Sequence, residues 1–113
     1  MANPSKKKGT AWETALVEYL KLSGFPYAER RALCGTSDRG DVAGIPGVVL
    51  EAKAEKTITL STYMDEVATE KQNANAQVGA AVIKRRNRGP GDSYVVMTLE
   101  TFARLLADDE VTA

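Results

Sequence analysis

A buried strand that carries two charged residues constrains this chain more than any other feature. The apolar residues 48–50 lead directly into Glu51-Ala52-Lys53-Ala54, which predicts a strand buried on both faces. Side chains alternate along a strand, so Glu51 and Lys53 point the same way and Ala52 offers only its backbone carbonyl. Because an unpaired buried charge is costly, these two charges predict partners or a metal ion.

A hairpin is expected to bring Asp41 close to Glu51. Residues 41–44 predict a short strand, residues 45–47 a turn, and residues 48–54 the central strand. Two carboxylates suffice for a hard cation such as Mg²⁺, which prefers oxygen ligands and keeps several waters. Asp41, Glu51 and the carbonyl of Ala52 are therefore candidate metal ligands. Lys53 is a candidate to orient a water or to stabilise an attacked phosphate. The alternative is a solvated strand face with a weak ion pair.

Glu13 is a third candidate acid. A helix is predicted from about Ala11 to Ser23, with Thr10 as its N-cap. At about 100° per residue, Glu13 falls inside the apolar arc of this helix. Burying a carboxylate there is energetically costly unless a partner group compensates its charge. Residues 10–13 also match a capping box, in which the glutamate reaches back to the N-cap amide. A cap, a third metal ligand, a ligand through water and a residue that positions the nucleophile all remain open.

The remaining segments predict a mixed α/β (α+β) fold. A weak strand is expected over residues 27–33, a helix capped by Ser61 and extending to about Ala76, strands over 78–83 and 94–97, and a last helix capped by Thr98. This order predicts a central mixed β-sheet of about five strands flanked by helices, with the strand after the second helix running parallel in the sheet. Glu70 lies at the edge of the buried stripe of the second helix and is an additional candidate for the site.

Length and composition limit the remaining possibilities. The 113 residues are 43% hydrophobic and 27% charged, which fits one soluble domain over residues 11–107 with a basic tail at 1–10 and an acidic tail at 108–113. The absence of histidine and the single cysteine exclude a Cys/His zinc site, a Ser-His-Asp triad and an internal disulfide. No apolar stretch is long enough for a membrane span and no secretory signal is present, so a cytoplasmic location without membrane contact is expected.

Positive charge is clustered although the formal net charge is zero. A basic excess is the usual sign of phosphate binding, and here the neutral total conceals basic clusters near the N-terminus, around a polar loop and after the fourth strand. We expect these clusters to contact DNA phosphates, and a solvated tail or loop is the alternative for each. The candidates are Lys6, Lys7, Lys8, Arg30, Arg31, Ser37, Arg39, Lys84, Arg85, Arg86 and Arg88.

The acidic residues and the lysine together resemble the PD-(D/E)XK nuclease superfamily. Glu13 in the first helix, Asp41 at the hairpin and Glu51-Ala52-Lys53 on the next strand carry the resemblance, with a helix and a strand afterwards. Gly40 stands where the superfamily has the proline that names it. More narrowly, the chain is similar to the small Holliday junction resolvases of archaea and phages through Lys8-Gly9 and the helix that follows, residues 35–53 and residues 81–86.

The resemblance implies a restriction-endonuclease-like core and a Mg²⁺-dependent DNA endonuclease, with Mn²⁺ expected to substitute. It implies a homodimer that resolves four-way (Holliday) junctions by paired nicks in DNA recombination and repair, in the host cytoplasm if a phage encodes it. Asp41 and Glu51 would be metal ligands, Lys53 would assist water attack, and Glu13 would be the helix-borne acid. Archaeal resolvases also carry a catalytic loop serine, for which Ser37 is a candidate.

Two alternatives to junction resolution remain from the sequence. One is another endonuclease of the same superfamily, of the restriction or repair type. The other is a non-catalytic DNA-binding module in which Glu51 and Lys53 form a structural ion pair.

Overall fold

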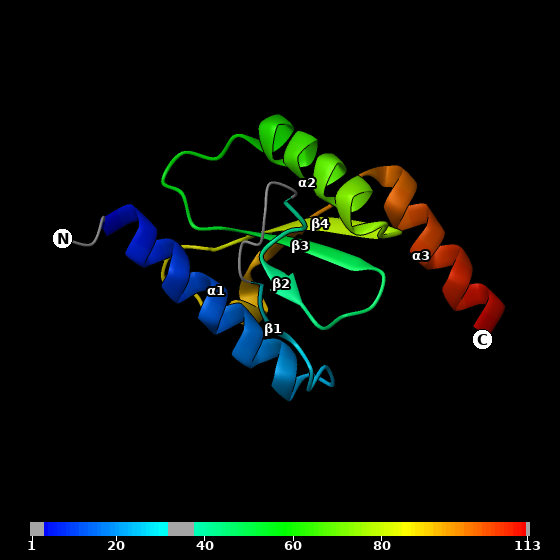
Figure 1. The fold of residues 1–113 in the computed structure, drawn as a ribbon, viewed down its shortest axis with the longest axis horizontal. Helices are drawn as coiled ribbons and strands as arrows, with labels where there is room; N and C mark the ends of the chain where they lie inside the picture. The colour runs from blue at the N-terminus through cyan, green and yellow to red at the C-terminus, as the bar shows by residue number, and fades with distance from the viewer. Residues whose placement is uncertain (1–3, 32–37, 113) are drawn as a thin grey trace.

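A mixed five-stranded sheet with helices packed on it forms the molecule (Figure 1). The computed structural model describes residues 4–31 and 38–112, and describes side chains over residues 9–31 and 38–108. The predicted α+β fold class is confirmed, and the strands lie in the sheet in chain order. The elements are α1 (Pro4–Leu22), β1 (Glu29–Arg30), β2 (Val42–Ala43), β3 (Val48–Lys53), α2 (Leu60–Ala74), β4 (Val78–Ile83), the 3-10 turn η1 (Pro90–Asp92), β5 (Tyr94–Val96) and α3 (Leu99–Thr112).

The central strands β3 and β4 run parallel, as the sequence predicts for the strand after the second helix. Their register pairs Glu51 with Ala81 and Lys53 with Ile83. The helix α2 forms the crossover between the two strands, and the other three strand pairs are antiparallel. Parallel strands end at the same edge of a sheet, so Glu51 and Lys53 lie at the carboxyl edge where ligands of open α/β sheets commonly bind.

One face of the sheet is covered by α1. Trp12 and Leu16 pack against Val82, and the Trp12 indole N–H donates a hydrogen bond to the Val82 carbonyl at 3.2 Å. The helix begins at Pro4 rather than near Ala11, so the expected basic tail is helical from residue 4 onward. Its buried stripe is narrower than the predicted arc, because two apolar residues of that arc, Tyr19 and Leu22, are exposed.

The helix α2 covers the opposite face, as the ribbon shows (Figure 1). Tyr63 and Val67 pack against Ala81 and Ile83. Thr59 is the N-cap, rather than Ser61 as predicted, and it makes no side-chain capping hydrogen bond. Because side chains alternate on a strand, α1 faces Leu50 and Ala52 of β3, and α2 faces the layer that contains Glu51 and Lys53.

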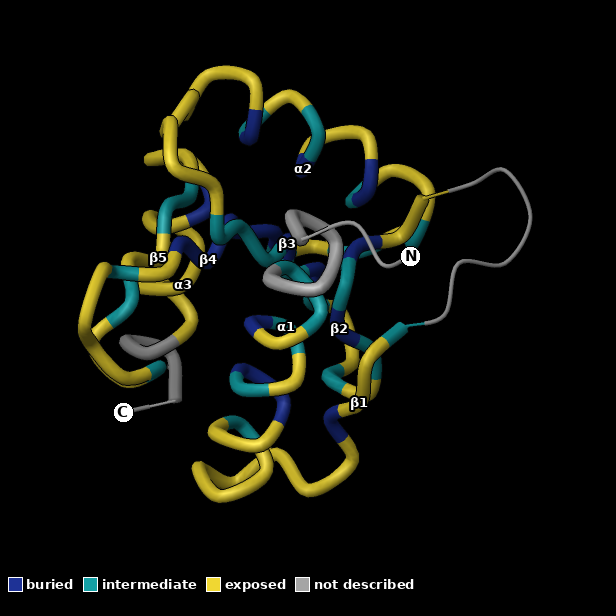
Figure 2. Tube along the Cα trace, turned by 90° about the vertical axis from the view of Figure 1, so that its left-hand side faces the viewer, coloured by how far each residue is buried: buried dark blue, intermediate teal, exposed yellow. Residues whose placement is uncertain are grey.

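The C-terminal helix α3 leaves its apolar side in solvent, as the exposed colour along most of it indicates (Figure 2). Leu99, Phe102 and Leu106 form one apolar face of this helix, yet they are 81%, 44% and 52% exposed. Thr101, on the other side of the helix, is the buried residue. The helix also continues through the predicted acidic tail to Thr112. The apolar periodicity therefore predicts the helix correctly but not the side that packs on the sheet.

The edge strand β5 carries a second exposed apolar surface. Tyr94 and Val95 are half-exposed, and with Ile58 and Leu60 they line a groove of about 520 Å³. Within the described parts of the chain, no helix is both long and apolar enough to cross a membrane.

Candidate active site

Asp41 is fixed against the central strand by its backbone and its side chain. Its backbone N–H donates to the Leu50 carbonyl at 2.9 Å, and its Oδ2 accepts a hydrogen bond from the Ala52 N–H at 2.8 Å. The hairpin pairs Val42 with Leu50, so the predicted approach of Asp41 to the Glu51 segment is confirmed. The N–H and C=O of one strand residue point to the same side, so the Ala52 carbonyl, a predicted ligand, also faces Asp41.

The glycine before Asp41 is required by the backbone. Gly40 has φ +90°, a conformation that glycine adopts without strain and that proline, fixed near −65°, cannot adopt. A Cβ added there would lie 3.0 Å from both the Leu50 carbonyl oxygen and Val49 Cγ1. The Gly40 N–H also donates to Asp38 Oδ1 at 2.9 Å, a bond that proline could not make. The local backbone therefore requires glycine rather than proline at this position.

Glu51 is a buried acid surrounded by other acids. The residue is 8% exposed, and no hydrogen-bond donor reaches its Oε2 among the described residues. Burial, a hydrogen bond to the Glu70 carboxylate and the charge of Asp41 raise the pKa of Glu51 to about 10. Burial also raises the pKa of Asp41, although the hydrogen bond from Ala52 opposes this shift. The two acids interact directly, so their site favours a proton or a cation between them.

Glu70, a less prominent sequence candidate, lies in the centre of the buried layer. The residue is 1% exposed, and no N–H, ammonium or hydroxyl group of the described structure donates a hydrogen bond to either carboxylate oxygen. Burial raises the pKa of Glu70, a hydrogen bond with Glu51 opposes this rise, and the charges of Asp38 and Asp41 add to it. Oxygens of Asp38, Glu51 and Glu70 all lie within 4.8 Å of one another, so the three carboxylates form one cluster.

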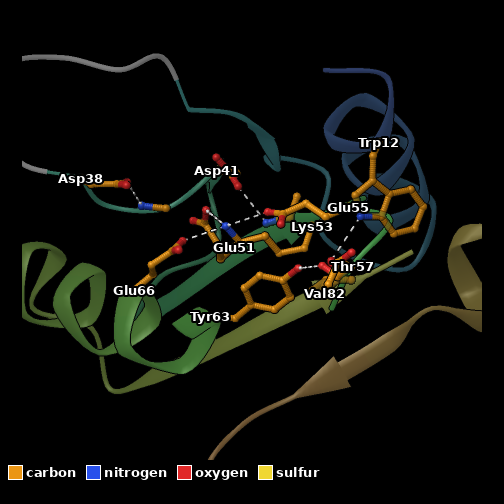
Figure 3. A network of polar contacts seen from close by, with 12 residues as sticks. Trp12, Asp38, Asp41, Glu51, Lys53, Glu55, Thr57, Tyr63, Glu66 and Val82 are labelled. Atoms are coloured by element: carbon orange, nitrogen blue, oxygen red, sulfur yellow. Dashed lines mark hydrogen bonds and ion pairs between the residues drawn. The ribbon is translucent and has the colours of Figure 1, made fainter. Parts of the chain in front are cut away.

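Lys53 is held in a network of three glutamates (Figure 3). Its Nζ lies 2.7 Å from Glu66 Oε2, 3.6 Å from Glu51 Oε1 and 3.7 Å from Glu55 Oε1. It also lies 4.9 Å from the centre of the Tyr63 ring. Burial lowers the pKa of Lys53, but the hydrogen bond to Glu66 and the nearby negative charges outweigh burial and raise it overall. Lys53 is therefore a fixed positive charge at this edge of the sheet.

Glu13 approaches Asp41 from α1. Burial raises the pKa of Glu13, the charge of Asp41 adds to the rise, and Arg30 opposes it. The Glu13 Oε2 lies 3.9 Å from the guanidinium of Arg30. The predicted capping box is wrong, because α1 begins six residues before Thr10 and this threonine is inside the helix. Glu13 is thus a half-buried acid near Asp41, as the positioning interpretation requires.

The predicted DNA-contacting residues occupy several places. Arg39, Lys84, Arg86 and Arg88 are exposed. Arg85 is partly buried, with its guanidinium 5.1 Å from the centre of the Tyr94 ring. Arg30 forms an ion pair with Glu13. Arg31 is partly buried, and its Nε has no hydrogen-bond partner in the described structure. The side chains of Lys6, Lys7 and Lys8, and all of Ser37, lie outside the described residues.

Sequence reasoning missed Asp38, Glu55 and Glu66. Glu66 lies four residues before Glu70 on α2, so the spacing that places Glu70 at the buried stripe also places Glu66 on a neighbouring part of that face. Asp38 gives no such signal, because its position depends on the conformation of a loop. Its backbone carbonyl accepts a hydrogen bond from Asn73 Nδ2 at 2.8 Å, which ties the loop to α2.

The acidic centre has the donor set that a hard divalent cation prefers. Asp41 and Glu51 present carboxylate oxygens, the Ala52 carbonyl faces the same side, and Glu51 Oε2 is buried without a donor in the described structure. Comparisons of this chain with protein families, curated proteins and solved structures found no match.

Proposed function

We propose that this protein is a Mg²⁺-dependent DNA endonuclease of the PD-(D/E)XK type with a restriction-endonuclease-like core. In this proposal it cuts four-way junctions by paired nicks, as a homodimer in the cytoplasm. The observation that carries the proposal is the convergence of Asp41, Glu51 and Lys53 at the carboxyl edge of β3. Asp41 and Glu51, with the Ala52 carbonyl, would hold Mg²⁺ or Mn²⁺.

The chemistry proposed for this site is hydrolysis of a phosphodiester. A cation bound there would act as a Lewis acid and lower the pKa of a bound water. The hydrogen bond from Ala52 N–H holds the Asp41 carboxylate in place. Glu13, with its raised pKa, lies near Asp41 and would position the water through a hydrogen bond.

Lys53 would contribute charge rather than remove a proton. Glu66 and Glu51 raise the pKa of its ammonium group, so Lys53 stays positive at ordinary pH. A fixed positive charge stabilises the negative charge that grows on an attacked phosphate. Replacing Lys53 with methionine should therefore abolish cleavage without abolishing DNA binding.

The segment Lys84–Arg88 is a proposed DNA-binding segment beside the site. The Lys84 N–H donates to the Lys53 carbonyl at 2.9 Å, so this basic segment begins beside the lysine of the site. Contacts to phosphates confer affinity without sequence information. Arg86→Glu should weaken binding to unrelated sequences alike. Arg85→Glu should weaken binding too, but should also destabilise the protein because Arg85 packs on Tyr94.

A second copy of this chain is the proposed occupant of the exposed apolar face of α3. Cutting two opposed strands of a junction requires two active sites, and a two-fold dimer supplies them with one interface. The face formed by Leu99, Phe102 and Leu106 points away from the buried Thr101. The groove beside β5 is also lined by exposed apolar residues. In this proposal the same partner covers both surfaces.

Substrate comparison is the experiment that tests this function. Wild-type protein is incubated with a synthetic four-way junction, a flap and a linear duplex, each with Mg²⁺ or EDTA. The proposal predicts Mg²⁺-dependent paired nicks in the junction and little cutting of the other two. Preferential cutting of the flap or duplex would instead support a repair or restriction endonuclease.

A non-catalytic DNA-binding module is the second candidate function. It is favoured by the ion pairs of Lys53, whose shortest contact is with Glu66 rather than with Glu51. In that case the charges at the edge of β3 only hold α2 in place. This candidate predicts tight junction binding and no strand cleavage with Mg²⁺, Mn²⁺ or Ca²⁺.

A further inference from the structure

Three segments of the chain contribute one carboxylate each to a cluster beneath α2. Asp38 comes from the loop before β2, Glu51 from β3 and Glu70 from α2, and their oxygens lie within 4.8 Å of one another. Figure 3 shows the first two, with Asp38 on its loop and Glu51 on the strand. Asp41, the ligand proposed for catalysis, is directed to the Ala52 N–H instead.

Glu70 is the member of the cluster that most requires a ligand. It is 1% exposed, and within the described structure no N–H, ammonium or hydroxyl group donates a hydrogen bond to either of its oxygens. A buried carboxylate without a donor or counter-ion is strongly disfavoured. Lys53 does not supply the missing charge, because its contacts are with Glu51, Glu55 and Glu66.

The surrounding backbone holds these carboxylates in place. Asn73 Nδ2 donates to the Asp38 carbonyl at 2.8 Å, and Asp38 Oδ1 accepts from the Gly40 N–H at 2.9 Å. Gly40 passes so close that an added Cβ would lie 3.6 Å from Glu70 Oε2. The loop is therefore packed over the buried glutamate, with Asp38 fixed beside α2.

We propose that Asp38, Glu51 and Glu70 bind a structural divalent cation that fastens α2 and the loop to β3. Two oxygens bound to one Mg²⁺ or Ca²⁺ lie at most about 5.2 Å apart. The three carboxylate oxygens are all within 4.8 Å of one another, so their separations are compatible with one shared cation. The cation occupies a position separate from the one proposed between Asp41 and the Ala52 carbonyl, and Glu51 is shared. The inference goes beyond the nuclease proposal, because it requires no DNA cleavage.

Cation binding at this position has a defined mechanical effect. Without it, the repulsion among the three carboxylates opposes the docking of α2 and of the loop against the sheet. With it, a divalent cation offsets two of the three negative charges and so reduces this repulsion. The folded protein therefore binds the cation and the unfolded chain does not, so the cation raises the unfolding temperature.

Thermal unfolding and calorimetric titration of the full chain test the proposal, with MgCl₂, CaCl₂ and MnCl₂ as probes against EDTA. Wild-type protein should unfold at a higher temperature with a cation. Glu70→Gln should bind at least about tenfold more weakly. In EDTA this variant should be more stable than wild type, because one repelling charge is removed. The matched control is Asp65→Asn, which makes the same change at an exposed position of α2 and should behave as wild type.

Asp38→Asn and Asp41→Asn complete the test. Asp38→Asn should also weaken cation binding, which keeps the proposal testable if Glu70→Gln does not fold. Asp41→Asn should retain the Glu70-dependent binding even if it abolishes cleavage. Wild-type affinity in both Glu70→Gln and Asp38→Asn, or no cation-dependent stabilisation of wild type, would overturn the proposal. If no junction is cut but Glu70-dependent binding is present, the nuclease proposal fails and this one stands.

Discussion

Lys53 Nζ lies 2.7 Å from Glu66 Oε2, so an ion pair joins the carboxyl end of β3 to α2. The contact is shorter than the 3.6 Å that separates the same ammonium from Glu51 within the strand motif. Lys53 has a side chain that is 12% exposed, so the pair is shielded from solvent on the lysine side. Under the nuclease proposal, Glu66 is a positioning residue that aims Lys53.

Replacing Glu66 with glutamine should slow junction cleavage by about tenfold. Without the ion pair the Lys53 ammonium is positioned less well, so it stabilises the transition state less. The affinity for junction DNA should change little, so the loss should appear in single-turnover rates rather than in binding. Glu55→Gln is the matched control, since Glu55 is more exposed and lies farther from Lys53 at 3.7 Å. Equal rates for both variants and wild type would show that Glu66 does not position Lys53.

Stability of the cation-free protein should fall as pH rises from about 5 to about 9. The pKa of Glu51 is about 10 in the folded protein, against about 4.3 in an unfolded chain. The folded state therefore holds more protons across that window, and its stability decreases by up to about 1.4 kcal/mol per pH unit for one retained proton. The raised pKa values of Glu13, Asp41 and Glu70 act in the same direction.

Urea unfolding in EDTA at pH 5.5, 7.0 and 8.5 measures this dependence. Glu51→Gln removes the main titrating group, so its stability should vary less with pH than that of wild type. Saturating Ca²⁺ should also flatten the profile, because the cation replaces the retained proton. A wild-type protein that becomes more stable between pH 5.5 and 8.5 in EDTA would contradict the assignment.

Placing proline at position 40 should destabilise the protein by about 3 kcal/mol or more. The substitution Gly40→Pro is incompatible with φ +90° and removes the hydrogen bond to Asp38 Oδ1. Gly40→Ala keeps that N–H and should cost about 1–3 kcal/mol through backbone strain. Gly9→Ala, inside α1 with no atom near the added Cβ, should instead stabilise by about 0.5–1 kcal/mol. Urea unfolding checks all three, and wild-type stability of Gly40→Pro would refute the described loop conformation.

Charge placed on the exposed face of α3 should disrupt the proposed dimer. The double substitution Phe102→Glu and Leu106→Glu puts two acids on the apolar face, so sedimentation should show a monomer at concentrations where wild type is a dimer. Arg104→Gln changes the other side of the same helix and should leave the dimer intact. A wild-type protein that sediments as a monomer would show that this face does not bind a second copy.

The strands around the site could be predicted because their signals are local. Residues 78–83 are apolar and bounded by polar residues, and the strand has those bounds. The hairpin that brings Asp41 to the Glu51 segment follows from two short strands and a turn. Side-chain alternation on β3 then places Glu51 and Lys53 on one face.

The features that could not be predicted from the sequence depend on contacts between segments far apart in the chain. Asp38 joins the acidic cluster only because its loop is tied to Asn73. Helix periodicity placed Glu70 at the edge of a stripe, whereas the packing of α2 on the sheet buries it almost completely. The apolar face of α3 lies in solvent, and Thr101 packs inward instead. Periodicity identifies an apolar face but not the surface that covers it.

Cleavage of a synthetic four-way junction by wild type and by Asp41→Asn, each with Mg²⁺ or EDTA, tests the central claim most directly. The substituted amide has nearly the same shape as the carboxylate but lacks its negative charge, so the fold should persist while cation binding at the catalytic position is lost. We predict paired nicks by wild type with Mg²⁺, none in EDTA, and a rate at least about a hundredfold lower for Asp41→Asn. Cleavage by Asp41→Asn at the wild-type rate, or no cleavage by wild type with Mg²⁺ or Mn²⁺, would contradict the account.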